Sequence, residues 1–152
     1  MRPGYHGQKT HRANGTDPIP VLVHLKIFTD ITAATAGNDA RRFVVTDDLG
    51  GTYIRSVNIT VTTVGGSSTG VQIHNLTNLD DVLTTIATID AGYTNSYDST
   101  APHDIDTSGT PAVNRVLRGD ILRVDVDDGS DAMGLEVLLE FGPQISKVTP
   151  PP

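Results

Sequence analysis

The sequence contains neither cysteine nor tryptophan, and aromatic residues make up only 5% of it. Without cysteine the chain can form neither disulfide bonds nor thiolate metal sites. Without tryptophan, and with so few other aromatics, it has little material for the stacking platforms on which sugars and bases are commonly bound. These absences weaken any proposal of a sugar cleft or of a base-stacking surface.

Long apolar runs and glutamate are also scarce. The best apolar run, residues 19–28, is short and is interrupted by Pro20, His24 and Lys26. We therefore expect neither a signal peptide nor a membrane span. Of the eighteen acidic residues sixteen are Asp. Because Asp, Thr, Gly and Asn suit turns and strands, whereas Glu, Lys, Ala and Leu suit helices, this composition predicts a β protein.

The length and the charge limit the classes of function. A chain of 152 residues is one domain of ordinary size, able to bury most of its apolar surface. Its formal net charge is -7. A surface of that sign repels phosphate backbones, so we expect no direct binding to nucleic acid.

Apolar and polar side chains alternate along most of the middle of the chain. In residues 53–62 the apolar face carries Tyr53, Val57, Ile59 and Val61, as in a half-buried strand. Further predicted strands lie at 25–31, 41–46, 71–76, 84–90 and in two runs within 118–141, with a helical turn at 79–83 and a long loop at 93–111. About eight strands with regular turn signals are typical of a sandwich. We predict an all-β fold, a single antiparallel β-sandwich of jelly-roll type.

The segment from Arg118 to Phe141 carries the strongest pattern. In its first run Leu122, Val124 and Val126 share one face. Arg123, Asp125 and Asp127 share the other. Since an Asp-Gly-Ser-Asp corner separates this run from the second one, the sequence predicts a long antiparallel hairpin with one dry face and one acidic, solvated face.

The two ends of the chain lack such periodicity. Residues 1–20 carry three prolines and three glycines, and residues 147–152 end in Pro150-Pro151-Pro152. We predict three parts: an extended N-terminal arm (1–20), a β-sandwich domain (21–146) and a proline-rich tail (147–152). Arg2, Lys9 and Arg12 make the arm basic whereas the body is acidic, which would let the arm pack on a neighbouring body.

No motif for catalysis or for a cofactor is present. The five histidines are scattered, and no GxSxG elbow or phosphate loop occurs, so we predict a protein that is not an enzyme and has no cofactor or metal. Asp125, Asp127, Asp128 and Asp131 suggest calcium, but their spacing fails the EF-hand loop. The tripeptide Arg118-Gly119-Asp120 precedes a strand, so we interpret it as turn chemistry rather than as an attachment motif.

Two stretches resemble virion proteins of tailed bacteriophages. His11-Arg12-Ala13-Asn14-Gly15-Thr16-Asp17-Pro18-Ile19 resembles the HRxxGxDPI sequence near the start of phage fibre and head-associated modules. A second series, Gly70–Thr77, Leu83–Asp90, Arg118–Asp127 and Gly134–Phe141, is similar to small β-sandwich domains of phage fibres and capsid accessory proteins. The chain departs from receptor-binding fibres because it has neither repeats nor a separate tip.

The resemblance implies a non-enzymatic structural protein of the virion, assembled in the host cytoplasm. We expect a homotrimeric capsid decoration protein whose partners are its own copies and the major capsid protein or other virion proteins. The residues expected to anchor it are in the arm: Arg2, Tyr5, His11, Arg12, Asp17, Pro18 and Ile19. The alternatives are a minor tail component and a receptor- or glycan-binding module of a head or tail fibre. For that module the long loop offers Tyr93, Asn95, Tyr97 and Asp98.

Overall fold

The computed structural model describes residues 20–29 and 32–144. Within these residues the chain forms ten strands and one short 3₁₀ helix, η2 (Ser96–Asp98). The strands are β1 (Val21–Lys26), β2 (Gly37–Val44), β3 (Tyr53–Thr60), β4 (Thr69–Asn75), β5 (Asp80–Asp81), β6 (Leu83–Thr85), β7 (Ala87–Ile89), β8 (Asp104–Ile105), β9 (Ile121–Asp128) and β10 (Glu136–Gly142). No helix in this part of the chain is long and apolar enough to cross a membrane.

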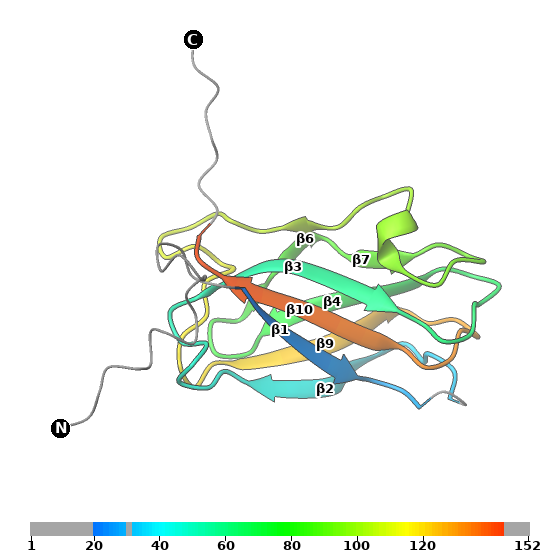
Figure 1. The fold of residues 1–152 in the computed structure, drawn as a ribbon, viewed down its shortest axis with the longest axis horizontal. Helices are drawn as coiled ribbons and strands as arrows, with labels where there is room; N and C mark the ends of the chain where they lie inside the picture. The colour runs from blue at the N-terminus through cyan, green and yellow to red at the C-terminus, as the bar shows by residue number, and fades with distance from the viewer. Residues whose placement is uncertain (1–19, 30–31, 145–152) are drawn as a thin grey trace, which may run out of the picture.

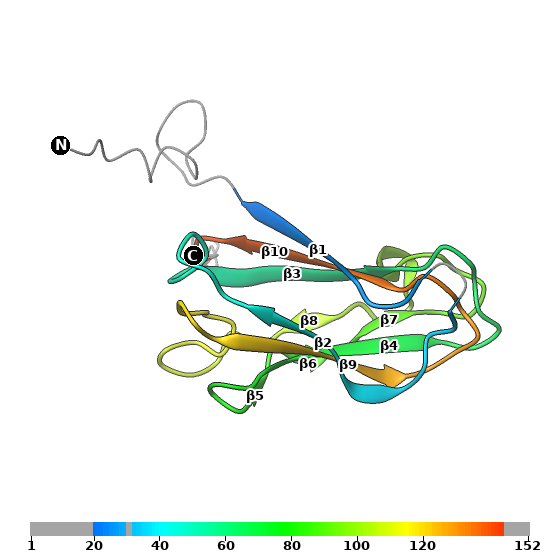
Figure 2. The ribbon, with the colours of Figure 1, turned by 90° about the horizontal axis from the view of Figure 1, so that it is seen from below.

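Eight of these ten strands form two antiparallel layers that pack face to face (Figure 1 and Figure 2), and β6 and β8 form a separate two-stranded sheet. One sheet has the order β1-β10-β3, and the other has the order β2-β9-β4-β5 with β7 also paired to β4. The strands β1 to β4 alternate between the two sheets, after which β9 inserts between β2 and β4, and β10 between β1 and β3. This is jelly-roll connectivity. The predicted all-β sandwich of jelly-roll type is therefore confirmed.

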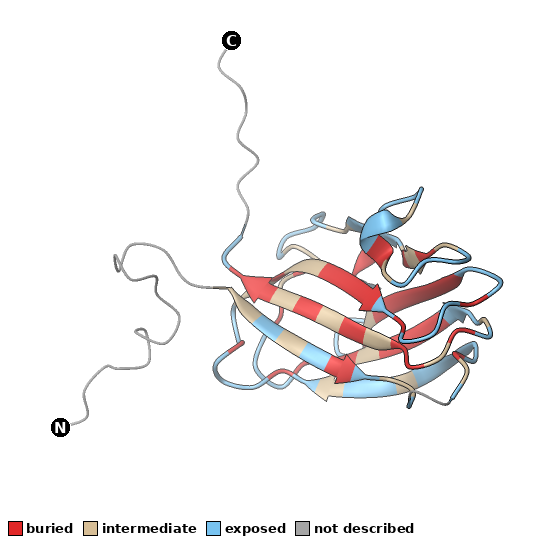
Figure 3. Cartoon of the chain, turned by 45° about the vertical axis from the view of Figure 1, so that its right-hand side comes forward, coloured by how far each residue is buried: buried red, intermediate tan, exposed pale blue. Residues whose placement is uncertain are grey.

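The core lies between the two sheets and is made by the inward side chains of alternate residues (Figure 3). From β9 these are Leu122, Val124 and Val126, as the alternation predicts, and each is at most 2% exposed. From the opposite sheet the Phe141 ring meets the Phe43 ring of β2, with 6.1 Å between ring centroids. Each such side chain contributes roughly 2 kcal/mol by its removal from water. The sandwich is held together mainly by this layer.

The predicted hairpin between Arg118 and Phe141 is wrong. Strand β9 pairs with β2 and β4, whereas β10 pairs with β1 and β3, and residues 129–135 cross from one sheet to the other. The alternation correctly gave two strands with apolar faces. It could not give their partners, because two apolar faces can lie side by side in one sheet or face each other across a core.

Strand β3 departs from simple alternation at two places. Ile54 and Val57 are both fully buried although they are three positions apart in the strand, because the pairing with β10 shifts register between Glu140 and Phe141. Such a bulge turns the following side chains to the other face. Asn58, predicted to face solvent, is also buried, since η2 covers it and its Nδ2 donates to the hydroxyl of Tyr97 in that helix at 2.9 Å.

Several predicted boundaries change. The first strand begins at Val21 and ends at Lys26 instead of covering 25–31, and the predicted strand at 84–90 is split into β6 and β7. The predicted helical turn at 79–83 is wrong, because Leu79 is part of a tight turn and β5 follows it at once. The tail at 147–152 and the arm, apart from Pro20, lie outside the described residues.

Candidate functional site

The predicted anchoring residues cannot be located on the fold. All seven lie outside the described residues: Arg2, Tyr5, His11, Arg12, Asp17, Pro18 and Ile19. The point where the arm joins the body is defined, because Val21 pairs with Phe141 in the three-stranded sheet. The structural description of a site is therefore confined to the sandwich.

The Arg118-Gly119-Asp120 tripeptide is a turn that leads into β9. The Asp120 side chain is buried, and its Oδ2 accepts hydrogen bonds from the Leu117 backbone N–H at 2.9 Å and from the Asn75 Nδ2 at 3.1 Å. Gly119 has a φ of +87°, a conformation that glycine adopts without strain. Because the Asp120 carboxylate is buried and hydrogen-bonded within this turn, the geometry agrees with a structural role for the tripeptide.

Asp125 does not lie on a solvated face, contrary to the prediction. Its side chain is buried, and its Oδ2 accepts a hydrogen bond from Arg123 Nη2 at 2.6 Å. Its Oδ1 accepts the backbone N–H of Asp39 at 2.7 Å. Asp39 has a φ of +66° at the register shift of β2, so Asp125 fixes the irregular edge strand to β9.

The other aspartates of this region have different surroundings. Asp131 Oδ1 accepts the backbone N–H of Gly66 at 2.7 Å. Burial raises the pKa of Asp127, and the nearby charges of Asp125, Asp128 and Asp81 raise it further. Among the residues that the structure describes, no group of three or more His, Asp or Glu side chains is placed to hold a metal ion.

The predicted long loop folds around η2. Asn95 caps this helix, with its Oδ1 accepting the Tyr97 backbone N–H at 2.9 Å and its Nδ2 donating to Asp98 at 3.0 Å. The side chains of Asn95 and Asp98 are thus hydrogen-bonded to each other. The Tyr97 ring is 74% exposed and Tyr93 is also exposed, so the two tyrosines remain available to a partner. Of the four residues predicted from the sequence, the loop brings Asn95, Tyr97 and Asp98 together.

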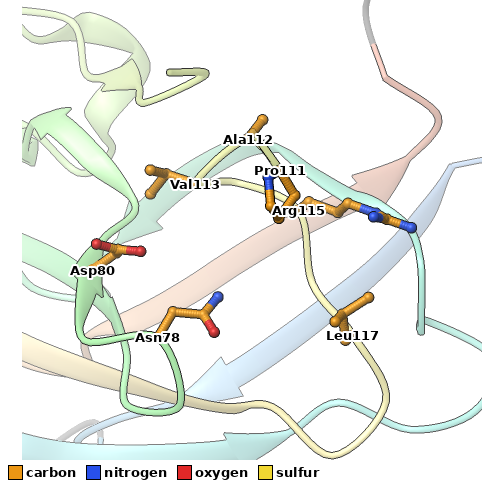
Figure 4. Close-up of a pocket in the computed structure, with 7 residues that line it drawn as sticks. All are labelled: Asn78, Asp80, Pro111, Ala112, Val113, Arg115 and Leu117. Atoms are coloured by element: carbon orange, nitrogen blue, oxygen red, sulfur yellow. The ribbon is translucent and has the colours of Figure 1, made fainter. Parts of the chain in front are cut away.

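A pocket of about 300 Å³ lies where the β4–β5 turn meets the segment before β9 (Figure 4). It is lined by Asn78, Asp80, Pro111, Ala112, Val113, Arg115 and Leu117. Figure 4 shows the Arg115 side chain directed away from Asp80, and the Arg115 Nε is buried without a hydrogen-bond partner. No lining residue is a Ser, Cys or His, so the lining suits binding of a mixed polar and apolar surface rather than nucleophilic chemistry.

The turn beside this pocket holds an apolar side chain in solvent. Leu79 has a φ of +64° and is 75% exposed. Its backbone N–H donates to the Asn75 carbonyl at 2.8 Å, and the buried Asn75 side chain accepts the Thr77 N–H at 2.9 Å. A leucine in this conformation costs of order 1 kcal/mol, which the Asn75 hydrogen bonds offset.

The chain matches no protein-family model, no curated protein sequence and no solved structure. The arrangement of its own side chains is therefore the basis for a functional proposal. Sequence reasoning missed the pocket because its two sides, near residues 78–80 and 111–117, are separated by about thirty residues and neither forms a motif. The sequence did offer one signal for a surface site here, the leucine between Asn78 and Asp80 in a predicted turn. Turns rarely favour a large apolar side chain.

Proposed function

We propose that this protein is a non-enzymatic structural component of a bacteriophage virion, a capsid decoration protein that acts as a homotrimer. The proposal is supported by the HRxxGxDPI-like stretch His11–Ile19 and by the jelly-roll-like body to which it is joined. Its partners are further copies of the chain and the major capsid protein or other virion proteins. Its place is the virion.

The observation that carries the proposal is the separation of charge between arm and body. Residues 1–19 contain three basic side chains and one acidic side chain. The described residues contain sixteen acidic and seven basic side chains, a formal net charge of -9. Opposite charges of this size attract a basic arm to an acidic neighbouring body and raise the association rate. An arm exchanged between neighbours links them across a lattice.

The mechanism of such a protein is mechanical. Burial of the arm and of part of the sandwich across the joints between capsomers adds interface to the assembled shell. A protein that binds only the assembled lattice stabilises that lattice by mass action. The decorated head then resists heat and internal pressure better than the bare head. The anchoring residues of this proposal are those of the arm, above all Arg2 and Arg12.

Two other virion roles remain as proposals. A receptor- or glycan-binding module of a head or tail fibre is favoured by the exposed rings of Tyr93 and Tyr97, because flat aromatic faces bind sugar rings. A glycan array with the full chain tests it, with Tyr97→Ala as the variant that loses binding. A minor tail component would share the fold and the arm, and would be found on tails instead of heads.

The experiment compares heads purified with and without this protein. Heads that lack it should lose DNA at a lower temperature and be more sensitive to chelators, and adding the wild-type protein should restore resistance. A variant with Arg2, Lys9 and Arg12 changed to Glu should fold normally but fail to restore it. Equal resistance of the two kinds of head, together with absence of the protein from wild-type heads, would refute the decoration role.

A further inference from the structure

Strand β1 forms a free edge of the three-stranded sheet. The order of that sheet is β1-β10-β3, so β1 lies at its margin (Figure 1). Among the residues that the structure describes, β1 pairs only with β10. An edge strand presents a row of backbone N–H and C=O groups to which another strand can add. The edges of this sandwich differ in how far they are protected from such an addition.

The opposite edge of the same sheet is covered by the loop that contains η2. On β3 the Val57 backbone N donates to the His103 Nε2 at 3.4 Å, and the Ile59 backbone N donates to the Ser96 Oγ at 3.0 Å. A further strand could pair with β3 only by displacing this loop.

The β2 edge of the larger sheet is irregular and charged. Its register with β9 shifts between Gly37 and Arg41, and the Asp39 N–H donates to the Asp125 side chain. Arg41 is exposed and lies opposite Val124, which places a charge on the face that packs the core. A bulge and an inward-facing charge are means by which proteins keep an edge strand from pairing. Strand β2 is thus a protected edge.

Strand β1 has neither of these protections. Its register with β10 is continuous from Val21 to Lys26, and residues 21–25 contain no Asp, Glu, Lys or Arg. On the outer face Leu22 is 57% exposed. On the inner face Val21 and Val23 are only half-buried. Strand β1 therefore offers a regular edge with incompletely covered apolar side chains on both faces.

The backbone groups of Leu22 and His24 face this free edge. Ile27, which follows β1 in the same register, donates its N–H to the Leu135 carbonyl at 2.9 Å. In an antiparallel ladder, residues bonded to one neighbour alternate with residues whose N–H and C=O groups point away from it. By this alternation residues 21, 23 and 25 bond to β10, whereas Leu22 and His24 point away from it.

We propose that the β1 edge pairs with the β1 edge of a second copy, antiparallel, about a two-fold axis beside Val23. In this register Leu22 lies opposite His24 of the second copy, and these residues exchange backbone hydrogen bonds on each side of the axis. Val23 lies opposite its own equivalent, and Val21 lies opposite Leu25 of the second copy. Each pair joins side chains of the same face, so the two three-stranded sheets become one.

A second copy suits this edge because the contact is self-complementary. A two-fold contact places the same patch on both partners, so a patch that repels itself is excluded. Around Val23 the paired side chains are apolar or imidazole. The Lys26 ammonium at the end of the strand forms an ion pair with Glu136 at 3.4 Å, which reduces the like charge brought to the contact.

The contact goes beyond the proposed trimer, because it joins two copies about a two-fold axis whatever larger assembly they belong to. In the decoration role it would connect copies of neighbouring trimers. Val21, where the arm joins the body, would then lie against the body of another copy.

The test uses the absence of cysteine from the sequence. Val23→Cys should form a disulfide-linked dimer under mild oxidation, since antiparallel pairs of this kind hold their Cα atoms about 4.5 Å apart, a distance that a disulfide can span. Each chain then has a single cysteine, so the covalent product is a dimer whatever the size of the assembly. Val44→Cys, at an exposed position on β2, is the matched control and should give only the background of chance collisions.

A second change disrupts the contact without touching the cysteine. Leu22→Lys, added to Val23→Cys, should abolish the cross-link, because lysines would then stand on both sides of the axis. Leu79→Lys makes the same change at another exposed leucine and should leave the cross-link intact.

Three results would overturn the inference. The first is a Val23→Cys protein that melts like the wild type and cross-links no more than Val44→Cys. The second is a wild-type protein that sediments as a monomer at about 100 μM, roughly a hundredfold above a micromolar Kd. The third is a cross-link from Val23→Cys to a tagged Thr10→Cys protein with none between Val23→Cys chains, which would mean that an arm occupies the edge. Binding to purified heads tests the decoration role separately, so the two failures are distinguishable.

Discussion

Asp125 and Asp127 lie two residues apart on β9 and have different surroundings. Asp125 is buried and accepts hydrogen bonds from Arg123 and from the Asp39 backbone. Asp127 is exposed over much of its surface, but the partial shielding of its carboxyl from water raises its pKa, and the charges of the neighbouring aspartates raise it further. The Asp125 carboxylate thus serves as a hydrogen-bond acceptor that holds the strand edge. The Asp127 carboxylate is repelled by the neighbouring aspartates.

Replacing each of these aspartates separates the two roles. Asp125→Ala should lower the free energy of unfolding by about 2 kcal/mol, because a hydrogen bond to a charged group is lost and the Arg123 guanidinium loses its partner. Asp127→Asn should leave that free energy unchanged or raise it, since a raised pKa means that the folded state disfavours the charged form. Urea unfolding at pH 7 measures both. Equal losses in the two variants would contradict this assignment.

His103 provides a prediction of pH dependence. Its Nε2 lies 3.4 Å from the Val57 backbone N–H, and burial lowers the pKa of its imidazole although the Asp104 charge raises it in part. A lowered pKa means that the unfolded chain takes up the proton first, so stability should fall as the pH drops below about 6.5. In His103→Gln this part of the loss should vanish. The measurement is thermal unfolding of the two proteins between pH 7.5 and 5.5, about one unit on either side of that value. If the melting temperatures of the wild type and of the variant fall in parallel with pH, His103 does not cause the loss.

At the level of elements, the crossing at 129–135 decides which fold the alternating strands adopt. Gly129 lies against the chain before β2, where an added Cβ would be 2.5 Å from the Ala36 N and 2.9 Å from the Ala34 carbonyl oxygen. Ser130 N donates to that same carbonyl at 2.8 Å. The crossing can turn into the second sheet only because no side chain stands at this point.

Gly129→Ala should therefore lower the free energy of unfolding by about 1–3 kcal/mol, as overpacking against backbone does. Gly66→Ala is the matched control, because the nearest atom to its added Cβ is Asp131 Oδ2 at 3.7 Å, an ordinary contact. Urea denaturation of the two variants compares them directly. A loss in Gly66→Ala as large as that in Gly129→Ala would show that the close approach at Gly129 is not the cause.

The sequence predicted strands and inward faces better than it predicted partners. Leu122, Val124 and Val126 are buried as expected because period-two alternation is a local property. The pairing of β9 with β2 and β4 depends on contacts across the chain, which alternation does not encode. The buried Asn58 likewise needed the distant Tyr97 to cover it. The pocket could not be predicted for the same reason, since its two sides meet only in the fold.

At the level of the whole molecule, the N-terminal arm and the body carry net charges of opposite sign. Residues 1–19 contain three basic and one acidic side chain, whereas the described residues contain sixteen acidic and seven basic side chains. Exposed charges of this kind are screened beyond about 8 Å at physiological salt. In the proposed role, attraction between the arm of one copy and the body of its neighbour would therefore act at short range.

Self-association should accordingly weaken as salt is added. Between about 50 mM and about 500 mM sodium chloride the Debye length falls from roughly 14 to roughly 4 Å, and the dissociation constant of the wild-type oligomer should rise several-fold. The variant with Arg2, Lys9 and Arg12 changed to Glu should associate more weakly than the wild type at low salt, because its arm no longer attracts an acidic body. Sedimentation across this range measures the effect. A dissociation constant that does not change with salt would mean that apolar contacts alone hold the copies together.

The most direct test of the proposed role is the location of this protein on the virus particle. Cryo-electron microscopy of virions, with the chain tagged after Pro152 for labelling, should reveal three-fold density of the size of three sandwich domains on the outer surface of the head, repeated over the lattice. Label confined to the tail or to fibre tips, with heads unlabelled, would contradict the decoration role.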